Sequence, residues 1–310
     1  MRKTLVALLA AIIILCIIEI TFINFSQGES KTLSMAVEFN DHAAAAWVAL
    51  DRKMFEEEQL NLAHFETFQT GLELAAAMSR GDVEVGWVCL GPAILIHSSG
   101  VPVKVISGTH LHGYAIVSKP EIRDVKELDG KLVGCPGKGS PCYLVLRMAM
   151  EKYGFEPVIK KIKPYAALNA LLTGQLDAVA LPEHYVTLAK LRGGCNVLVR
   201  SQDLWPEMPG SVLVVREKVL KEKPEAVKRL VDATVKATGF IREHPREAAK
   251  IVAEKLGIKI EEAEESMGYL EYSNELSLKQ VQRYIDLMAK YGCIERSFPA
   301  EELVDLSYLR

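Results

Sequence analysis

The segment from Lys131 to Cys142 reads KLVGCPGKGSPC. Its first four residues are predicted to form a strand, and the pattern after the glycine-rich loop predicts a helix that ends at Tyr153. Ser140 can cap this helix, and Pro141 suits its first position. A strand that passes through a glycine-rich turn into a helix is typical of an α/β fold.

Short β-rich runs alternate with amphipathic stretches on both sides of this segment. The predicted strands are residues 33–38, 60–65, 83–88, 103–107, 114–118, 131–134, 158–162, 178–180, 197–199 and 211–215. The predicted helices are residues 43–55, 71–80, 91–98, 142–153, 166–173 and 183–191, followed by 224–244, 245–256, 260–269 and 278–291. The alternation predicts right-handed βαβ units and mostly parallel sheets flanked by helices, with a helical C-terminal segment.

Two successive α/β units predict a two-lobed protein, and 310 residues are enough for two domain-sized cores. Lobe one is predicted to comprise residues 31–115 and 214–310, and lobe two residues 116–213. The chain would then cross between the lobes twice, near residues 114–118 and 211–215. Paired crossings permit the two lobes to close on a ligand about a hinge.

The overall composition is that of an ordinary globular protein. Hydrophobic residues make up 49% of the chain and charged residues 25%, and the formal net charge is −3. Lys and Arg form no basic stripe in the sequence. Nucleic-acid binding is therefore not expected, because neutralising phosphates requires such a cluster of cations.

The first thirty residues differ from the rest. Arg2 and Lys3 precede an apolar run over residues 5–18, a pattern typical of a secretory signal peptide. Apolar residues continue more weakly to Phe25, so residues 1–30 are predicted to be either a cleaved signal or a retained membrane anchor. Either reading places the rest of the chain outside the cytoplasm, in the periplasm or on the outer face of the membrane.

Cysteines of an exported protein can form disulfides, because the compartment outside the cytoplasm is oxidising. Beyond the first thirty residues there are five, and an odd number cannot pair completely. Cys135 and Cys142 are close in sequence and could form a disulfide. Both could equally be small buried thiols within α/β packing.

A ligand site is expected where strands end, because ligands of open α/β sheets bind beyond the carboxyl ends of the strands. The loops at these positions are residues 39–42, 89–92, 109–113, 135–141 and 181–185. The ligand-binding residues predicted from them are Asn40, Asp41, Cys89, Leu90, Gly91, His112, Gly137, Lys138, Gly139, Ser140, Glu183, His184 and Tyr185.

The glycine-rich loop is the most informative of the five. Free backbone N–H groups and the Ser140 hydroxyl at the start of a helix could hold an oxyanion, although the glycines could also serve only to reverse the chain. The loop is not a Walker motif, because Pro141 follows Ser140, and Cys142 occupies the third glycine position of a dinucleotide fingerprint. Glu183 could accept a bond from an ammonium or amide group, or could simply stabilise a helix start.

Several histidines and cysteines also fall in the loops of the predicted crevice, and side chains of these types can bind a metal ion. Only His110 and His112 are closely spaced, and the sequence contains no HExxH or CxxC motif. No metal and no cofactor are therefore expected. The sequence also lacks a Gly-x-Ser-x-Gly elbow, and no nucleophile stands beside an obvious base, so catalysis is not expected.

Three ordered segments resemble the nitrate-, sulfonate- and taurine-type solute-binding proteins of ABC transporters. They are GLELAAAMSRGDVEVG with the following Gly91-Pro92 (residues 71–92), LDGKLVG with PGKGS (residues 128–140), and ALLTGQLDA (residues 170–178). This family also includes binders of thiamine-pyrimidine precursors and some related enzymes. The resemblance extends from about residue 31 to the C-terminal helices.

The resemblance implies a type II periplasmic-binding-protein fold and partnership with a membrane permease and its ATPase. Family ligand contacts map chiefly onto Asn40, residues 89–91, residues 137–140 and residues 183–185. Cys89 and Cys135 stand where many sulfonate binders would have Ser, Thr or Gly. This departure puts sulfonate or taurine specificity in doubt and leaves a larger or aromatic ligand open.

The expected function is that of a monomeric extracytoplasmic solute-binding subunit of an ABC importer. It would capture a small anionic or polar organic solute, nitrate-, sulfonate-, taurine- or pyrimidine-like, by hinge closure and without chemistry. Two alternatives remain open at this point: an enzyme of cofactor-precursor biosynthesis on the same fold, or a membrane-anchored ligand sensor.

Overall fold

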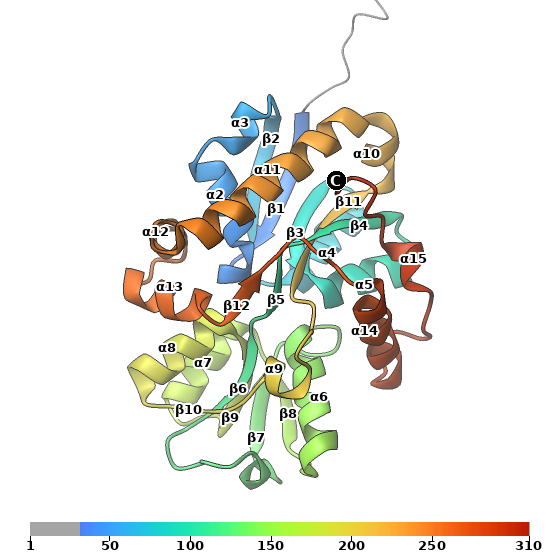
Figure 1. Cartoon of the computed structure of the whole chain (residues 1–310). Helices are drawn as coiled ribbons and strands as arrows, with labels where there is room; N and C mark the ends of the chain where they lie inside the picture. Colours follow the sequence, from blue (N-terminus) through green and yellow to red (C-terminus); the bar gives the residue numbers. More distant parts are fainter. Residues whose placement is uncertain (1–31, 310) are drawn as a thin grey trace, which may run out of the picture.

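The computed structural model describes residues 32–309. The predicted signal peptide or anchor, residues 1–30, lies outside the described residues. Figure 1 shows two α/β lobes, one above the other, joined by extended segments. Within residues 32–309 no helix is both long and apolar enough to cross a membrane.

The first sheet has five strands in the order β2-β1-β3-β11-β4. Their bounds are β1 Thr32–Glu38, β2 Asn61–Phe68, β3 Val85–Cys89, β4 Val103–Gly108 and β11 Ser211–Arg216. β1 is parallel to β2 and β3, whereas β11 is antiparallel to both β3 and β4. Four of the strands therefore run in one direction and β11 runs against them.

Alternate side chains of these strands enter two different hydrophobic cores. Met35 and Val37 pack with α2 (Ala44–Asp51), α11 (Pro224–Glu243) and α12 (Pro245–Leu256), whereas Ala36 faces the core that contains α4 (Gly71–Arg80), α5 (Leu90–Ser98) and α14 (Leu278–Lys290). This period of two is what a strand buried on both faces requires. We call the first sheet with these helices lobe one.

The second sheet has five strands in the order β10-β6-β9-β7-β8. Their bounds are β6 Tyr114–Ser118, β7 Leu132–Cys135, β8 Val158–Lys161, β9 Ala178–Pro182 and β10 Asn196–Arg200. α6 (Pro141–Tyr153) belongs to the core on one face, and α7 (Pro164–Leu172) and α8 (Glu183–Gly193) belong to the core on the other. We call this sheet with its three helices lobe two.

The two sheets repeat one topology. In each sheet the strand that runs against the others is the first one after the chain changes lobe, β6 in lobe two and β11 in lobe one. The predicted fold class, two lobes with mostly parallel sheets flanked by helices, is confirmed. The predicted lobe boundaries at 115/116 and 213/214 fall inside β6 and β11, and each of these strands lies wholly in one sheet.

A small two-stranded sheet lies between the lobes. It pairs β5 (His110–His112) with β12 (Leu270–Tyr272), and α13 (Ile260–Met267) precedes β12. Residues 109–113 were expected to form a crevice loop. This prediction is wrong for residues 110–112, which form β5. A strand of three residues is too short to produce an alternating pattern, and its partner strand lies far later in the chain, with Leu270 opposite His112 and Tyr272 opposite His110.

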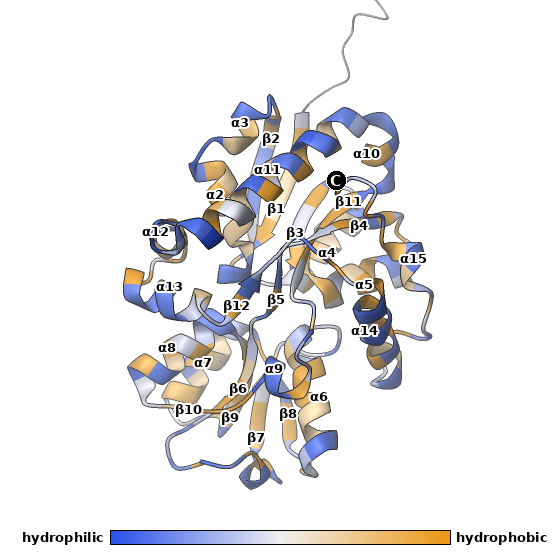
Figure 2. Ribbon diagram, in the orientation of Figure 1, coloured by the Kyte–Doolittle hydropathy of each residue, from blue (hydrophilic) through white to orange (hydrophobic). Residues whose placement is uncertain are grey.

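The remaining elements are short. They are η1 Asp41–Ala43, α3 Met54–Glu57, η2 Val125–Leu128, α9 Ser201–Leu204, α10 Glu217–Glu222 and α15 Ala300–Leu303. The helix predicted over residues 43–55 is divided, because Lys53 adopts a left-handed conformation with φ of 58° between α2 and α3. Figure 2 shows hydrophobic strands within both lobes and hydrophilic outer surfaces on α12 and α14.

Candidate functional site

A cavity lies between the lobes at the carboxyl ends of strands from both sheets. It encloses about 420 Å³ of space between atoms, its open mouth included. Lobe one contributes Glu38, Phe39, Asn40, Gln69, Thr70, Gly71, Leu72, Cys89 and Pro92, and lobe two contributes Tyr114, Pro136, Ser140, Pro141, Cys142, Pro164, Pro182 and Tyr185.

Helix N-termini from both lobes meet at this cavity. The residues that cap α4, α5, α6 and α8 all line it, namely Thr70, Cys89, Ser140 and Pro182, and α7 contributes its first residue, Pro164. Each helix has its positive end here, so the backbone makes the cavity favourable for negative charge.

The glycine-rich loop positions Ser140 at the start of α6. Gly137 and Gly139 have φ of 103° and 88°, a region that favours glycine. The Ser140 hydroxyl donates to the Gly137 carbonyl at 2.7 Å and accepts from the Tyr143 N–H at 3.2 Å. Its one proton is therefore used within the loop, and what it offers the cavity is an acceptor lone pair.

Glu38 is the one ordinarily charged side chain among the cavity-lining residues that the structure describes. It is buried at 4% exposure, and its carboxylate accepts from the Cys89 N–H at 2.8 Å, the Asn40 amide at 2.9 Å and the Cys89 thiol at 3.0 Å. Burial raises the pKa of Glu38, although these bonds lower it in part. The sequence prediction missed this residue.

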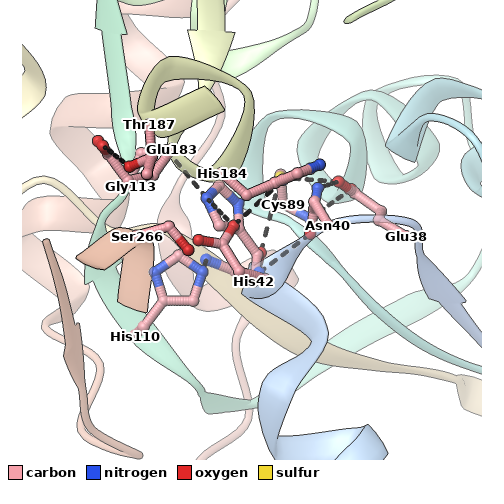
Figure 3. Close-up of polar contacts among 12 residues, drawn as sticks. Glu38, Asn40, His42, Cys89, His110, Gly113, Glu183, His184, Thr187 and Ser266 are labelled. Atoms are coloured by element: carbon pink, nitrogen blue, oxygen red, sulfur yellow. Dashed lines mark hydrogen bonds and ion pairs between the residues drawn. The ribbon is translucent and has the colours of Figure 1, made fainter. Parts of the chain in front are cut away.

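A second polar cluster surrounds Asp41, just beyond Asn40. Oδ1 of Asp41 lies 3.5 Å from Nδ1 of His184 and 3.7 Å from Nε2 of His42, and all three side chains are almost fully buried. His42 Nε2 also lies 2.9 Å from the Gly113 carbonyl. Figure 3 shows His42, His110 and His184 grouped beside Glu38, Asn40 and Cys89. Since His184 lies in the first turn of α8 in lobe two, this cluster joins the two lobes.

Burial determines the charge of this cluster. It lowers the pKa of His42 to about 4, so that this imidazole is neutral at physiological pH. Burial alone would raise the pKa of Asp41, but His184 and His42 outweigh it and hold the pKa below its usual value. Asp41 is therefore a buried carboxylate, and the imidazole nitrogen nearest to it, Nδ1 of His184 at 3.5 Å, comes from the other lobe.

A sequence model of the NMT1-like family matches residues 26–257. The chain belongs to the NMT1-like family. A putative aliphatic sulfonates-binding protein of Bacillus subtilis (strain 168) is 24% identical over an alignment that covers 100% of this chain and 96% of that protein. The taurine-binding periplasmic protein of Escherichia coli (strain K12) is 26% identical over 69% of this chain and 68% of its own.

Solved structures agree with these relatives in fold. The alkanesulfonate-binding protein SsuA from Xanthomonas axonopodis pv. citri, solved with MOPS bound, superimposes with a TM-score of 0.80 at 17% identity, covering 90% of this NMT1-like chain and 99% of its own. The resemblance identified from the three sequence segments, and the type II periplasmic-binding-protein fold that it implied, are confirmed.

Four residues of the predicted site line the cavity of this NMT1-like protein: Asn40, Cys89, Ser140 and Tyr185. Asp41 and His184 lie in the adjacent buried cluster instead. Glu183 also faces away from the cavity lining, where Arg200 Nη1 donates to its carboxylate at 2.5 Å.

The other predicted residues have structural contacts away from the cavity lining. Leu90 donates its N–H to the Gly210 carbonyl at 3.0 Å, and Nε2 of His112 lies 3.9 Å from a carboxylate oxygen of Glu271. Lys138 is exposed. The remaining three are glycines: Gly91 and Gly139 lie at the contact between α5 and the glycine-rich loop, whereas a Cβ on Gly137 would lie 3.2 Å from the side chain of Lys161.

The cysteines and histidines do not form a metal site in the described part of the chain. Residues 32–309 contain no group of three or more His, Cys, Asp and Glu side chains arranged to hold a metal ion. Cys135 and Cys142, for which a disulfide was left open, are both buried free thiols. Burial raises the pKa of Cys135 to about 11, so its thiol is protonated at neutral pH.

Proposed function

We propose that this NMT1-like protein is the extracytoplasmic solute-binding subunit of an ABC importer. The single observation that carries the proposal is a cavity lined by both lobes, onto which helix N-termini from both lobes converge. Relatives that align with most of the chain are named as binding proteins for aliphatic sulfonates and taurine, which supports the same function. The solute would be a small polar or anionic organic molecule.

The proposed mechanism is capture by closure of lobe two, which the chain enters at β6, against lobe one, to which it returns at β11. The lobes are joined through β5 and through the segment between β10 and β11. A solute that contacts residues of both lobes stabilises the closed arrangement over the open one by the free energy of the contacts that only the closed form makes. Binding then needs no covalent chemistry.

The proposed partners follow from this role. A membrane permease and its ATPase would receive the solute from the closed protein, which would act as a monomer. Residues 1–30 would direct export and could keep the protein attached to the membrane.

Small-angle scattering tests the proposal directly. The solute that co-purifies with the full chain is identified by mass spectrometry, removed by partial unfolding and dialysis, and then added back. We expect the radius of gyration to fall when the solute returns, and the thermal midpoint to rise by mass action. A tightly bound solute that leaves the radius unchanged would contradict closure. Conversion of the solute to a product would favour the enzyme alternative.

A further inference from the structure

The Glu38 carboxylate occupies the position in lobe one where an oxyanion would be expected to bind. The Cys89 N–H at the start of α5, the Asn40 amide and the Cys89 thiol all donate to it. It also lies against the first residue of α4, since a Cβ placed on Gly71 would be 1.9 Å from Glu38 Oε1. The positive ends of two helices in lobe one are therefore already neutralised by an anion of the chain itself.

The other polar side chains of the cavity add no positive charge. No Lys, Arg or His is among the described residues that line it. The Ser140 hydroxyl donates within its own loop and faces the cavity as an acceptor. The Tyr114 hydroxyl is buried, makes no hydrogen bond of ordinary length and can accept as well as donate.

A carboxylate and a set of acceptors in a small, largely apolar cavity are complementary to a hydrogen-bond donor. Ammonium and amino groups donate to a carboxylate through charge-assisted bonds, which are the stronger class. A simple sulfonate or nitrate placed against Glu38 would instead meet a like charge in a site from which water is mostly excluded.

We propose that Glu38 is a specificity-determining residue that selects a solute bearing an amino or ammonium group, which binds against its carboxylate. The inference rests on the proposed function, because it assumes that this cavity is the solute site. One side chain at the end of β1 would then disfavour simple sulfonates and nitrate in this cavity.

The test uses pairs of probes that differ only in an amino group. Suitable pairs are taurine and ethanesulfonate, 4-aminobutyrate and butyrate, and 4-amino-2-methylpyrimidine and 2-methylpyrimidine, titrated into the solute-free full chain by calorimetry. We expect at least one amino member to bind, and to bind about tenfold to a hundredfold more tightly than its partner. Glu38→Gln should remove that advantage and change the affinity for the partner by less than about threefold.

Gly71→Ala provides a second variant, in which Glu38 itself is not substituted. Its Cβ would lie 1.9 Å from Oε1 of Glu38 and 2.9 Å from Cγ of Pro92, so the carboxylate must move and Pro92 must shift slightly, whereas the backbone at this helix start accepts alanine. We expect the same loss of amine preference as in Glu38→Gln, with a thermal midpoint close to that of the wild type. The comparison of paired probes on the wild-type chain needs no variant. The inference can therefore be tested even if the Glu38→Gln protein does not fold.

Two results would overturn the inference. One is equal or tighter binding of the members without an amino group; the other is a panel in which no amino compound binds. If ethanesulfonate binds the wild-type chain and reduces its radius of gyration, the importer function stands and only the amine preference is lost. If probes bind without any change in radius, the proposed function itself fails.

Discussion

Glu183 shows how the helix start beside the cavity responds to pH. Its side chain is 1% exposed, and burial raises its pKa to about 7, while the adjacent Arg200 guanidinium offsets part of the rise. Because the pKa of this carboxyl is higher in the folded protein than its ordinary value of 4.5, the folded state keeps the proton up to a higher pH than the unfolded state does. It adds stability below pH 4.5 and loses this contribution as the pH rises through about 7.

Glu183→Gln should therefore flatten part of the pH dependence of stability. The difference between 4.5 and about 7 corresponds to roughly 3 kcal/mol, so the variant should gain up to that amount relative to the wild type between pH 5 and pH 8. Urea unfolding followed by circular dichroism at several pH values measures it. Glu254→Gln, at an exposed position, is the control. A constant difference between variant and wild type would show that Arg200 keeps Glu183 ionised throughout.

Predicted site residues lie at the cavity where the course of the backbone decides their position. Asn40, Cys89 and Ser140 line the cavity because each follows or ends a strand at the carboxyl edge of its sheet. Glu38 was missed because it is the last residue of β1, and the sequence does not say toward which side of the sheet edge a terminal side chain turns. Its partner Cys89 lies 51 residues away, so only the folded chain reveals their contact.

At the scale of elements, α5 of lobe one and the glycine-rich loop of lobe two lie in close contact. A Cβ on Gly91 would lie 2.5 Å from the Gly139 carbonyl oxygen, and a Cβ on Gly139 would lie 2.1 Å from a methyl carbon of Leu95. Gly91 belongs to the first turn of α5, where alanine suits the backbone. The helix itself does not require glycine at this position. Glycine is needed because a side chain here would collide with the glycine-rich loop of lobe two.

Gly91→Ala is therefore expected to hinder closure without destabilising lobe one. The affinity for the co-purified solute should fall at least tenfold because the backbone of the glycine-rich loop must retreat, and the thermal midpoint of the solute-free protein should stay within a few degrees. Calorimetry and thermal unfolding measure the two effects. Gly239→Ala in α11 is the matched control, since its Cβ would meet no atom within 4 Å. Equal affinities for the two variants would mean that the lobes do not close through this contact.

Elements with clear local signals at their ends could be predicted, and the strands of three residues could not. β6 and α12 were predicted with their observed bounds, because proline or an apolar run marks their ends clearly. β5 and β12 escaped prediction since their backbone partners lie far away in the chain: β5 pairs with β12 and also bonds to Met208 and Gly210. These two strands lie at the junction of the lobes, where tertiary contacts rather than local pattern determine structure.

At the scale of the whole molecule, contacts on two sides of the cavity hold the lobes together. On one side α6 of lobe two meets α14 of lobe one, where Lys290 and Tyr291 both donate to Glu151. On the other side α8 of lobe two packs on α13, which also packs on α12 of lobe one. Both sets of contacts lie near the surface, so water can replace them when the lobes separate.

Arg192 and Glu262 make the most specific of these contacts, and breaking it should shift the molecule toward the open form. Nε and Nη2 of Arg192 donate to the two carboxylate oxygens of Glu262 at 2.8 and 2.7 Å. Arg192→Met should lower solute affinity about threefold to tenfold and raise the radius of gyration at subsaturating solute. Lys221→Met, which removes an exposed pair within α10, should leave both unchanged. Unchanged binding in Arg192→Met would mean that α13 moves with lobe two, so that the hinge lies between α12 and α13.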